Sequence, residues 1–102
     1  MAPVHVFVMY PRKATFDMKY YLATHMPLVK KHWTQYGLTK YTVTQYEDPE
    51  SPYSVGCVLE FDSMDSYKKA GAGPEKDEVF GDIPNFSNEK PTLFAGEVTG
   101  TS

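Results

Sequence analysis

The stretch TFDMKYYLATHMPLVKKHWTQY, residues 15–36, decides the fold of this chain. At about 100° per residue, its lysines fall on one side of a helix and its apolar and aromatic residues on the other. Pro27 removes one backbone donor and crowds the carbonyl of Ala23, so a kink or break is expected there. His25 lies in the middle of the predicted buried stripe, which consists of Met18, Tyr21, Leu22, His25, Val29, His32 and Tyr36.

The segments around this helix predict an α+β domain. Short β-branched and aromatic runs at 4–10, 38–46, 53–61 and 93–98 read as strands, and further helices are expected from residue 64 and over 75–80. Asp17 or Thr15 is expected to cap the first helix, and Gly37 to end it. The order predicts a ferredoxin-like βαββαβ subunit, with a four-stranded antiparallel sheet and two helices on one face.

Length and composition limit the class of protein. The 102 residues are enough for one domain, 1–102, with a modest core. A net charge of -3 without a basic run predicts no nucleic-acid partner, and the lack of an apolar run of about 20 residues predicts no membrane partner. The single cysteine, Cys57, excludes an internal disulfide. Residues 10–13 interrupt the first apolar stretch, so no signal peptide and a cytoplasmic location are expected.

The first strand is apolar on both faces. Val4, Val6, Val8 and Tyr10 point one way, and His5, Phe7 and Met9 point the other. The helices can cover only one face of the sheet. We therefore expect a homodimer that packs two sheets face to face.

Several short motifs resemble those of the EthD family, which belongs to the dimeric α/β-barrel superfamily. They are FDxxYY at 16–21, THMPL at 24–28, GL at 37–38, DIPNFSN at 82–88 and GE at 96–97. The resemblance implies a ferredoxin-like subunit that dimerises through its sheets and uses no metal or organic cofactor. Relatives in fungal polyketide pathways act as dehydratases or decarboxylases, and other superfamily members are cyclases, lactone isomerases and cofactor-free monooxygenases.

The resemblance therefore implies proton transfer on an apolar substrate. We expect a small cofactor-free lyase, dehydratase or isomerase that performs dehydration, decarboxylation or cyclisation on an apolar aromatic or polyketide-like molecule. The alternative is a non-catalytic dimeric protein that binds small molecules or serves in a stress response.

His25 and Tyr21 are the predicted catalytic residues. An imidazole titrates near neutral pH and suits a general acid or base. Tyr21 lies one helical turn earlier, so its phenol can share a cavity with His25 and donate a proton. Both also have a structural interpretation, His25 as a core histidine bonded to a carbonyl freed by Pro27, and Tyr21 as a core aromatic. Burial would keep His25 neutral, a nearby carboxylate such as Asp82 would oppose this, and the sequence does not rank the two.

The predicted substrate-binding residues are His5, Phe7, Asp82, Asn85 and Phe86. His5 and Phe7 lie on the first strand, where His5 is expected to reach the cavity rim or, alternatively, to lie on the surface. The long loop 81–91 is expected to close the pocket, with Asp82 and Asn85 as polar groups and Phe86 as a wall. Alternatively, Asp82 and Asn85 bond the backbone of their own loop. The spacing of the histidines predicts no metal site.

Overall fold

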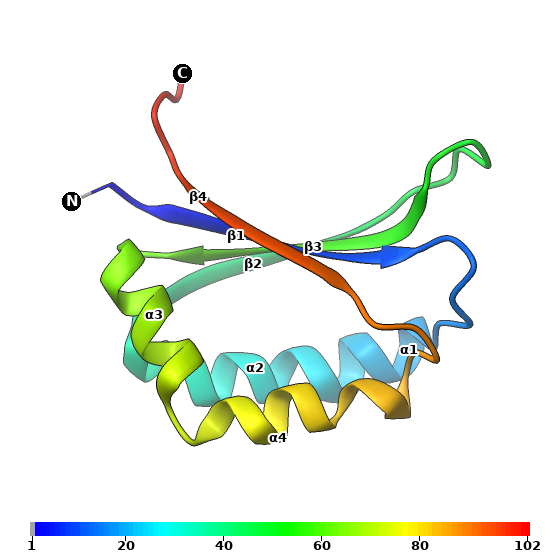
Figure 1. Ribbon diagram of the computed structural model, residues 1–102, viewed down its shortest axis with the longest axis horizontal. Coiled ribbons are helices and arrows are strands. Elements are labelled where there is room, and N and C mark those ends of the chain that lie inside the picture. Colours follow the sequence, from blue (N-terminus) through cyan, green and yellow to red (C-terminus); the bar gives the residue numbers. More distant parts are fainter. Residues whose placement is uncertain (1) are drawn as a thin grey trace.

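The computed structural model describes residues 2–102 and contains one four-stranded sheet. Its strands are β1 (Val4–Pro11), β2 (Leu38–Gln45), β3 (Tyr53–Phe61) and β4 (Thr92–Glu97). They lie in the order β2-β3-β1-β4, and each neighbouring pair is antiparallel. The helices all lie on one face of the sheet (Figure 1). The predicted α+β, ferredoxin-like βαββαβ arrangement is confirmed.

The first helical segment consists of four consecutive parts. These are α1 (Met18–Tyr20), a π-helical turn η1 (Tyr21–His25), α2 (Met26–Trp33) and a 3₁₀ turn η2 (Thr34–Tyr36). The Asp17 side chain accepts a hydrogen bond from the Tyr20 N–H and caps the start. Gly37 ends the segment with a φ of 113°, which a residue with a Cβ rarely adopts. Both signals act where the sequence predicts them.

The expected kink or break at Pro27 takes a different form. The ribbon runs without a break from α1 to α2 (Figure 1), and the irregularity is the wide turn directly before the proline. In this turn the Met26 N–H donates to the Tyr21 carbonyl, five residues back. Because Pro27 has no N–H to donate, a wider turn costs this stretch less than it would cost a regular helix.

The wide turn also changes which side chains are buried. Tyr21, His25 and Val29 are buried as predicted, but Leu22 is 49% exposed. Met26 and Trp33 are buried in addition to the predicted stripe. A uniform 100° step misplaces Leu22 because the π turn alters the angular position of the residues on either side of it.

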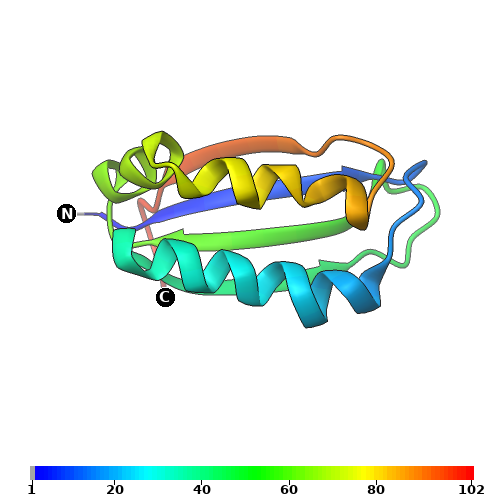
Figure 2. The ribbon, with the colours of Figure 1, turned by 90° about the horizontal axis from the view of Figure 1, so that it is seen from below.

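The second part of the helical layer begins after β3. It consists of α3 (Met64–Ala72), α4 (Glu75–Gly81) and a 3₁₀ turn η3 (Ile83–Asn85). Figure 2, seen from below, shows α2 and α4 side by side across one face of the sheet. His32 Nε2 of α2 lies 2.8 Å from Glu78 Oε2 of α4, a close contact between the two helices that does not have hydrogen-bond geometry. None of the helices in residues 2–102 has the length and apolar character that crossing a membrane requires.

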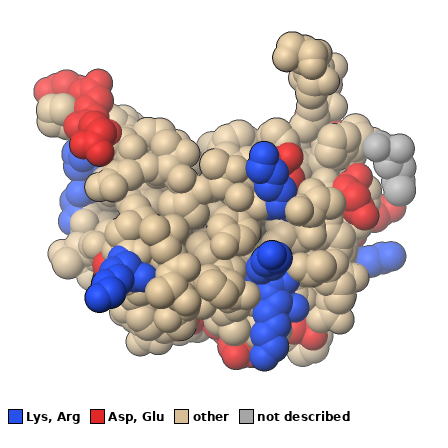
Figure 3. Space-filling view, turned by 180° about the vertical axis from the view of Figure 1, so that it is seen from behind, with Lys and Arg blue, Asp and Glu red and all other residues tan. Residues whose placement is uncertain are grey.

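The alternation of β1 separates two faces of the sheet. Val4, Val6 and Tyr10 are buried against the helices, whereas Phe7 and Met9 point to the face that no helix covers. On this uncovered face, Phe7 stacks on Phe94 of β4 with ring centroids 5.3 Å apart. Phe94 is nevertheless 51% exposed. In Figure 3 the upper surface is hollowed between the β2–β3 connection and the C-terminal tail, and Lys and Arg are scattered singly over the visible side.

Loop 81–91 is held against the turn that precedes α1. The Asp17 N–H donates to the Phe86 carbonyl at 2.8 Å, and the Thr15 N–H donates to Asn88 Oδ1 at 2.8 Å. Phe16 and Ser87 form an isolated β-bridge beside these bonds. Because the loop is held here, Asp82 comes next to the π turn.

Candidate functional site

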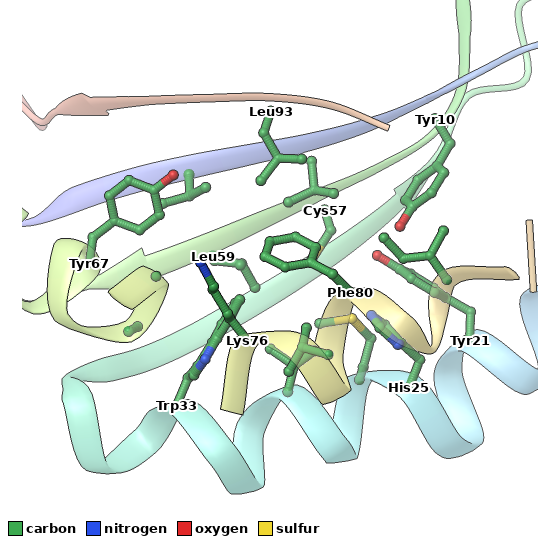
Figure 4. Close-up of a pocket in the computed structure, with 18 residues that line it drawn as sticks. Tyr10, Tyr21, His25, Trp33, Cys57, Leu59, Tyr67, Lys76, Phe80 and Leu93 are labelled. Atoms are coloured by element: carbon green, nitrogen blue, oxygen red, sulfur yellow. The ribbon is translucent and has the colours of Figure 1, made fainter. Parts of the chain in front are cut away.

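An apolar cavity of about 300 Å³ lies between the sheet and the helices. Its walls are mainly aliphatic and aromatic side chains from β1, β3, α2, α3 and α4 (Figure 4). Phe80 of α4 and Leu93 of β4 line it and are each more than one third exposed, so the cavity opens between these two elements. The volume is at the lower end of the range for small-molecule pockets. The polar or titratable side chains that line it are Tyr10, Tyr21, His25, Trp33, Cys57, Tyr67 and Lys76.

His25 reaches the cavity from the last residue of the π turn. Its side chain is only 5% exposed. The ring stacks on Tyr21, with centroids 5.4 Å apart and planes 13° apart, and Phe86 packs against it at 4.5 Å. These two aromatic neighbours fix the orientation of the imidazole.

Asp82 binds the His25 ring on the side that faces away from the cavity. His25 Nδ1 lies 2.9 Å from Asp82 Oδ2. The other carboxylate oxygen, Oδ1, accepts hydrogen bonds from the Tyr20 hydroxyl at 2.6 Å and from Asn85 Nδ2 at 2.9 Å. Both oxygens of Asp82 therefore have donors, and the carboxylate is held in one position.

These contacts set the charges of the pair. Burial lowers the pKa of His25, and although the hydrogen bond and charge of Asp82 oppose this, the net pKa lies below the ordinary 6.5. Burial alone would raise the pKa of Asp82, but hydrogen bonds from Tyr20, Asn85 and His25 outweigh burial and lower it below 3.8. At neutral pH the site therefore holds a neutral imidazole beside an ionised carboxylate.

The carboxylate also selects the tautomer of His25. An ionised carboxylate only accepts hydrogen bonds, so Nδ1 must carry the proton and Nε2 must present a lone pair. Within residues 2–102, Nδ1 has Asp82 as its partner and Nε2 has no hydrogen-bond partner. An imidazole in this state can accept a proton from a molecule in the cavity, with the resulting positive charge stabilised by Asp82.

Three further titratable groups line the cavity near His25. Burial raises the pKa of both the Tyr10 and the Tyr21 phenol far above the usual 10. Burial also raises the pKa of the Cys57 thiol to about 11. All three groups are therefore protonated at neutral pH, and each can donate a hydrogen bond.

The structure brings His25 and Tyr21 to the cavity, places Asp82 and Phe86 against His25, and bonds Asn85 to Asp82. Asp82 and Asn85 do not face the cavity as polar groups of a lid, because their side chains bond to each other and Asp82 bonds to His25. Phe86 is 2% exposed and packs behind His25 instead of lining the cavity. From loop 81–91, Ile83 contributes to the wall.

His5 and Phe7 are not part of this cavity, contrary to the sequence prediction. They occupy the odd positions of β1, whereas Val6 and Val8 line the cavity. His5 Nε2 instead lies 3.4 Å from Glu60 Oε1 on β3. Neighbouring residues of a strand point to opposite faces of the sheet. Because Val6 and Val8 face the helices, the side chains of His5 and Phe7 point away from them.

Five polar or titratable lining residues were missed as functional candidates: Tyr10, Trp33, Cys57, Tyr67 and Lys76. A signal existed for Tyr10, because it is the last member of the inward alternation Val4, Val6, Val8, Tyr10. Trp33 lies eight residues after His25, which places it on the same face of a helix. Lys76 comes from α4, and nothing in its local sequence points to the cavity. Within residues 2–102, no group of three or more His, Cys, Asp or Glu is placed to hold a metal ion.

No protein-family model matches the chain, and no curated protein sequence matches it. The fold and the cavity define a ferredoxin-like α+β protein whose helices enclose an apolar site against one face of its sheet. Among solved structures, an EthD-like protein from Ralstonia eutropha JMP134 is similar, with 29% identity and a TM-score of 0.84, over 100% of this chain and 96% of that chain. The resemblance to the EthD family that the motifs indicate is therefore confirmed.

Two more distant structures share the fold alone. One is a dimeric ferredoxin-like protein from an uncultured marine organism, with 17% identity and a TM-score of 0.70, over 100% of both chains. The other is SnoaB, a cofactor-independent oxygenase from Streptomyces nogalater, with 12% identity and a TM-score of 0.67, over 100% of this chain and 96% of that chain.

Proposed function

We propose that this protein is a small enzyme that transfers protons on an apolar aromatic molecule held in the cavity, with His25 as the general base. The observation that carries the proposal is the pairing of His25 Nδ1 with Asp82 at 2.9 Å, which leaves Nε2 available on the cavity side. Nε2 accepts a proton from the substrate, and the imidazolium that forms is stabilised by the ionised Asp82. The same nitrogen then returns the proton to a second atom of the substrate. Dehydration, decarboxylation, cyclisation and isomerisation all use such a transfer.

The size and walls of the cavity support a small substrate. A volume of about 300 Å³ with mostly apolar walls suits a molecule of one or two rings. Apolar walls also exclude water from His25, which strengthens its interaction with Asp82 and with the reacting atoms. We propose that the enzyme belongs to the lyase or isomerase class and works without a cofactor. The description of SnoaB as a cofactor-independent oxygenase supports only the second part, that a protein of this fold can work without a cofactor.

We further propose that the protein is a homodimer that buries the face of the sheet opposite the helices. Phe7, Met9 and Phe94 lie on this face, and Phe94 is half exposed in the single chain. An exposed apolar face of this kind is typical of an interface. The related marine protein is described as a dimeric ferredoxin-like protein, which supports the proposal.

The test of the proposed function uses His25→Asn, which keeps a hydrogen-bonding side chain of similar size but removes the base. A panel of small aromatic ketones, β-hydroxy ketones and β-keto acids would be incubated with the protein and followed by NMR. We expect conversion of at least one compound, and a loss of about 10²- to 10⁴-fold in the variant. The result that contradicts the proposal is conversion that His25→Asn leaves unchanged.

A second outcome would favour the non-catalytic alternative. If a compound binds in the cavity with one-to-one stoichiometry but none of the panel is converted, the protein is better described as a small-molecule-binding protein. Wild type and His25→Asn would then bind that compound equally well.

A further inference from the structure

We propose that the hydroxyl groups of Tyr10 and Tyr21 form an oxyanion-binding pair, and that the substrate has an enolisable carbonyl group. The carbonyl oxygen would lie between the two hydroxyls, and His25 would remove the proton from the adjacent carbon. This inference rests on the proposed function of His25 as a base. It adds Tyr10 as a catalytic residue and defines the chemical class of the substrate.

The two tyrosines reach the same part of the cavity from distant elements. Tyr10 is near the end of β1, and Tyr21 begins the π turn. Their ring centroids are 5.9 Å apart with planes at 78°, and each residue is 1% exposed. Figure 4 shows both hydroxyls turned toward each other at the end of the cavity where His25 lies. The rings are packed, and the polar tips face the same space.

Neither hydroxyl has the partner that a buried phenol normally has. Tyr20 and Tyr36 donate to carboxylates, to Asp82 at 2.6 Å and to Glu75 at 2.7 Å. In the described chain, by contrast, the hydroxyls of Tyr10 and Tyr21 bond to no oxygen or nitrogen, and Tyr21 has only the weakly accepting thiol of Cys57 nearby. Within the described chain, the fully enclosed polar side-chain atoms without a partner are His32 Nε2 and Trp33 Nε1, so the two phenol oxygens are not enclosed in this way. An oxygen atom of a bound molecule would give both hydroxyls a stronger acceptor than a thiol.

The reaction step follows from these positions. His25 Nε2 takes the proton from the carbon beside the carbonyl, the electron pair of that C–H bond forms a carbon–carbon double bond, and the π electrons of the carbonyl move to its oxygen. The negative oxygen then accepts hydrogen bonds from Tyr10 and Tyr21. In a β,γ-unsaturated ketone, the carbonyl then re-forms, the carbon–carbon double bond moves to the α and β carbons, and His25 returns the proton to the γ-carbon, which isomerises the substrate. In a β-hydroxy ketone, the carbonyl re-forms, a double bond forms between the α and β carbons, and the bond from the β-carbon to its hydroxyl oxygen breaks as that oxygen takes the proton from His25 and leaves as water.

The charges around the cavity favour this class of substrate over a cationic one. Burial keeps both phenols protonated, so they remain donors over the working pH range. The carboxylate of Asp82 is not available to a ligand, because His25, Tyr20 and Asn85 occupy both of its oxygens. Groups that donate to a developing negative charge therefore meet the reacting end of the substrate.

The first test uses 2-naphthol, a planar aromatic alcohol whose anion resembles an enolate, and does not depend on catalysis. The pKa of bound 2-naphthol would be measured by absorbance in wild type, Tyr10→Phe, Tyr21→Phe and the control Tyr67→Phe. Tyr67 lines the cavity at the end away from His25 (Figure 4). We expect each of the first two variants to raise the pKa of the bound ligand by about one unit relative to wild type, since each removes one donor to the anion. The control should match wild type.

Either of two results would overturn the oxyanion pair. One is that 2-naphthol does not bind to the wild-type protein, and the other is that its bound pKa is the same in all four proteins. Tyrosine-to-phenylalanine changes remove only the oxygen, so the packing of the rings is retained, and thermal unfolding of each variant would verify this.

The second test separates this inference from the proposed function. Exchange of the α-protons of 2-tetralone in D₂O would be followed by NMR with wild type, His25→Asn, Tyr10→Phe and Tyr21→Phe. We expect wild type to catalyse exchange, His25→Asn to abolish it, and each tyrosine variant to slow it by about 10²-fold. If only His25→Asn loses exchange, the tyrosines do not form an oxyanion-binding pair, and the role of His25 as the base stands. If His25→Asn exchanges the protons as fast as wild type, His25 is not the base. If wild type catalyses no exchange, the proposal that the substrate has an enolisable carbonyl group is wrong.

Discussion

His25 and Asp82 are 57 residues apart in the chain, yet His25 Nδ1 lies 2.9 Å from Asp82 Oδ2. The pair joins the π turn to the connection between α4 and β4. It orients the imidazole, selects its tautomer and stabilises the imidazolium that would form during proton transfer. The predictions below begin with this pair.

Replacement of Asp82 by Asn should lower the pKa of His25 further. The carboxylate opposes the effect of burial on His25, so removing its charge leaves burial less opposed. An NMR titration of the His25 ring would measure this in wild type and in Asp82→Asn. Glu60→Gln is the control, because Glu60 is near His5 on the opposite face of the sheet and should leave His25 unchanged. A higher His25 pKa in Asp82→Asn would show that the carboxylate does not have this role.

Acidification should destabilise the protein in two successive pH ranges. The folded-state pKa of His25 lies below 6.5. The contribution of His25 to the free energy of unfolding is therefore complete above pH 6.5 and decreases as the pH falls below that value. The folded-state pKa of Asp82 lies below 3.8, so its contribution is present above 3.8 and is lost as pH falls through the folded value. Urea unfolding at pH 7.5 and pH 5.5 would measure the first range. His25→Asn should show a smaller decrease between these pH values than wild type, and an equal decrease would refute the assignment.

Gly37→Ala should lower the free energy of unfolding by about 2 kcal/mol. The φ of 113° is strained for a residue with a Cβ, and the added carbon would lie 2.7 Å from both Asp62 Oδ1 and Ser66 Oγ. Gly71→Ala is a matched control within α3, because a Cβ there meets nothing within 4 Å. The control should be neutral or more stable by about 0.5–1 kcal/mol, through the higher helix propensity of Ala. Equal effects of the two variants in urea unfolding would contradict the role of Gly37.

Light scattering at micromolar concentration should give about twice the chain mass of 11.6 kDa. Phe94→Asp should shift the protein toward the monomer, because it places a charge on the face that we propose to be buried. Leu22→Asp is the control, since Leu22 is 49% exposed, close to the 51% of Phe94, but lies on the helical layer. A wild-type monomer, or equal dissociation by both variants, would argue against this interface.

The elements of this fold could be predicted from the sequence because their signals are local. The period of two in the strands, the capping by Asp17 and the positive φ at Gly37 act within a few neighbouring residues. The proximity of Tyr21 to His25 also follows from helical spacing over one turn. The EthD resemblance rests on short contiguous motifs, and it indicated the same fold.

Only the tertiary structure determines which of these residues are in contact. Alternation in β1 separates His5 and Phe7 from Val6, Val8 and Tyr10, but it does not state which set faces the helices and the cavity. Asp82 was expected over the pocket and is instead behind His25, because loop 81–91 is held to the turn before α1 by bonds between distant residues. The π turn changes the buried face of the helix and removes Leu22 from it. Such contacts depend on how the helical layer packs on the sheet, and local periodicity contains no information about that packing.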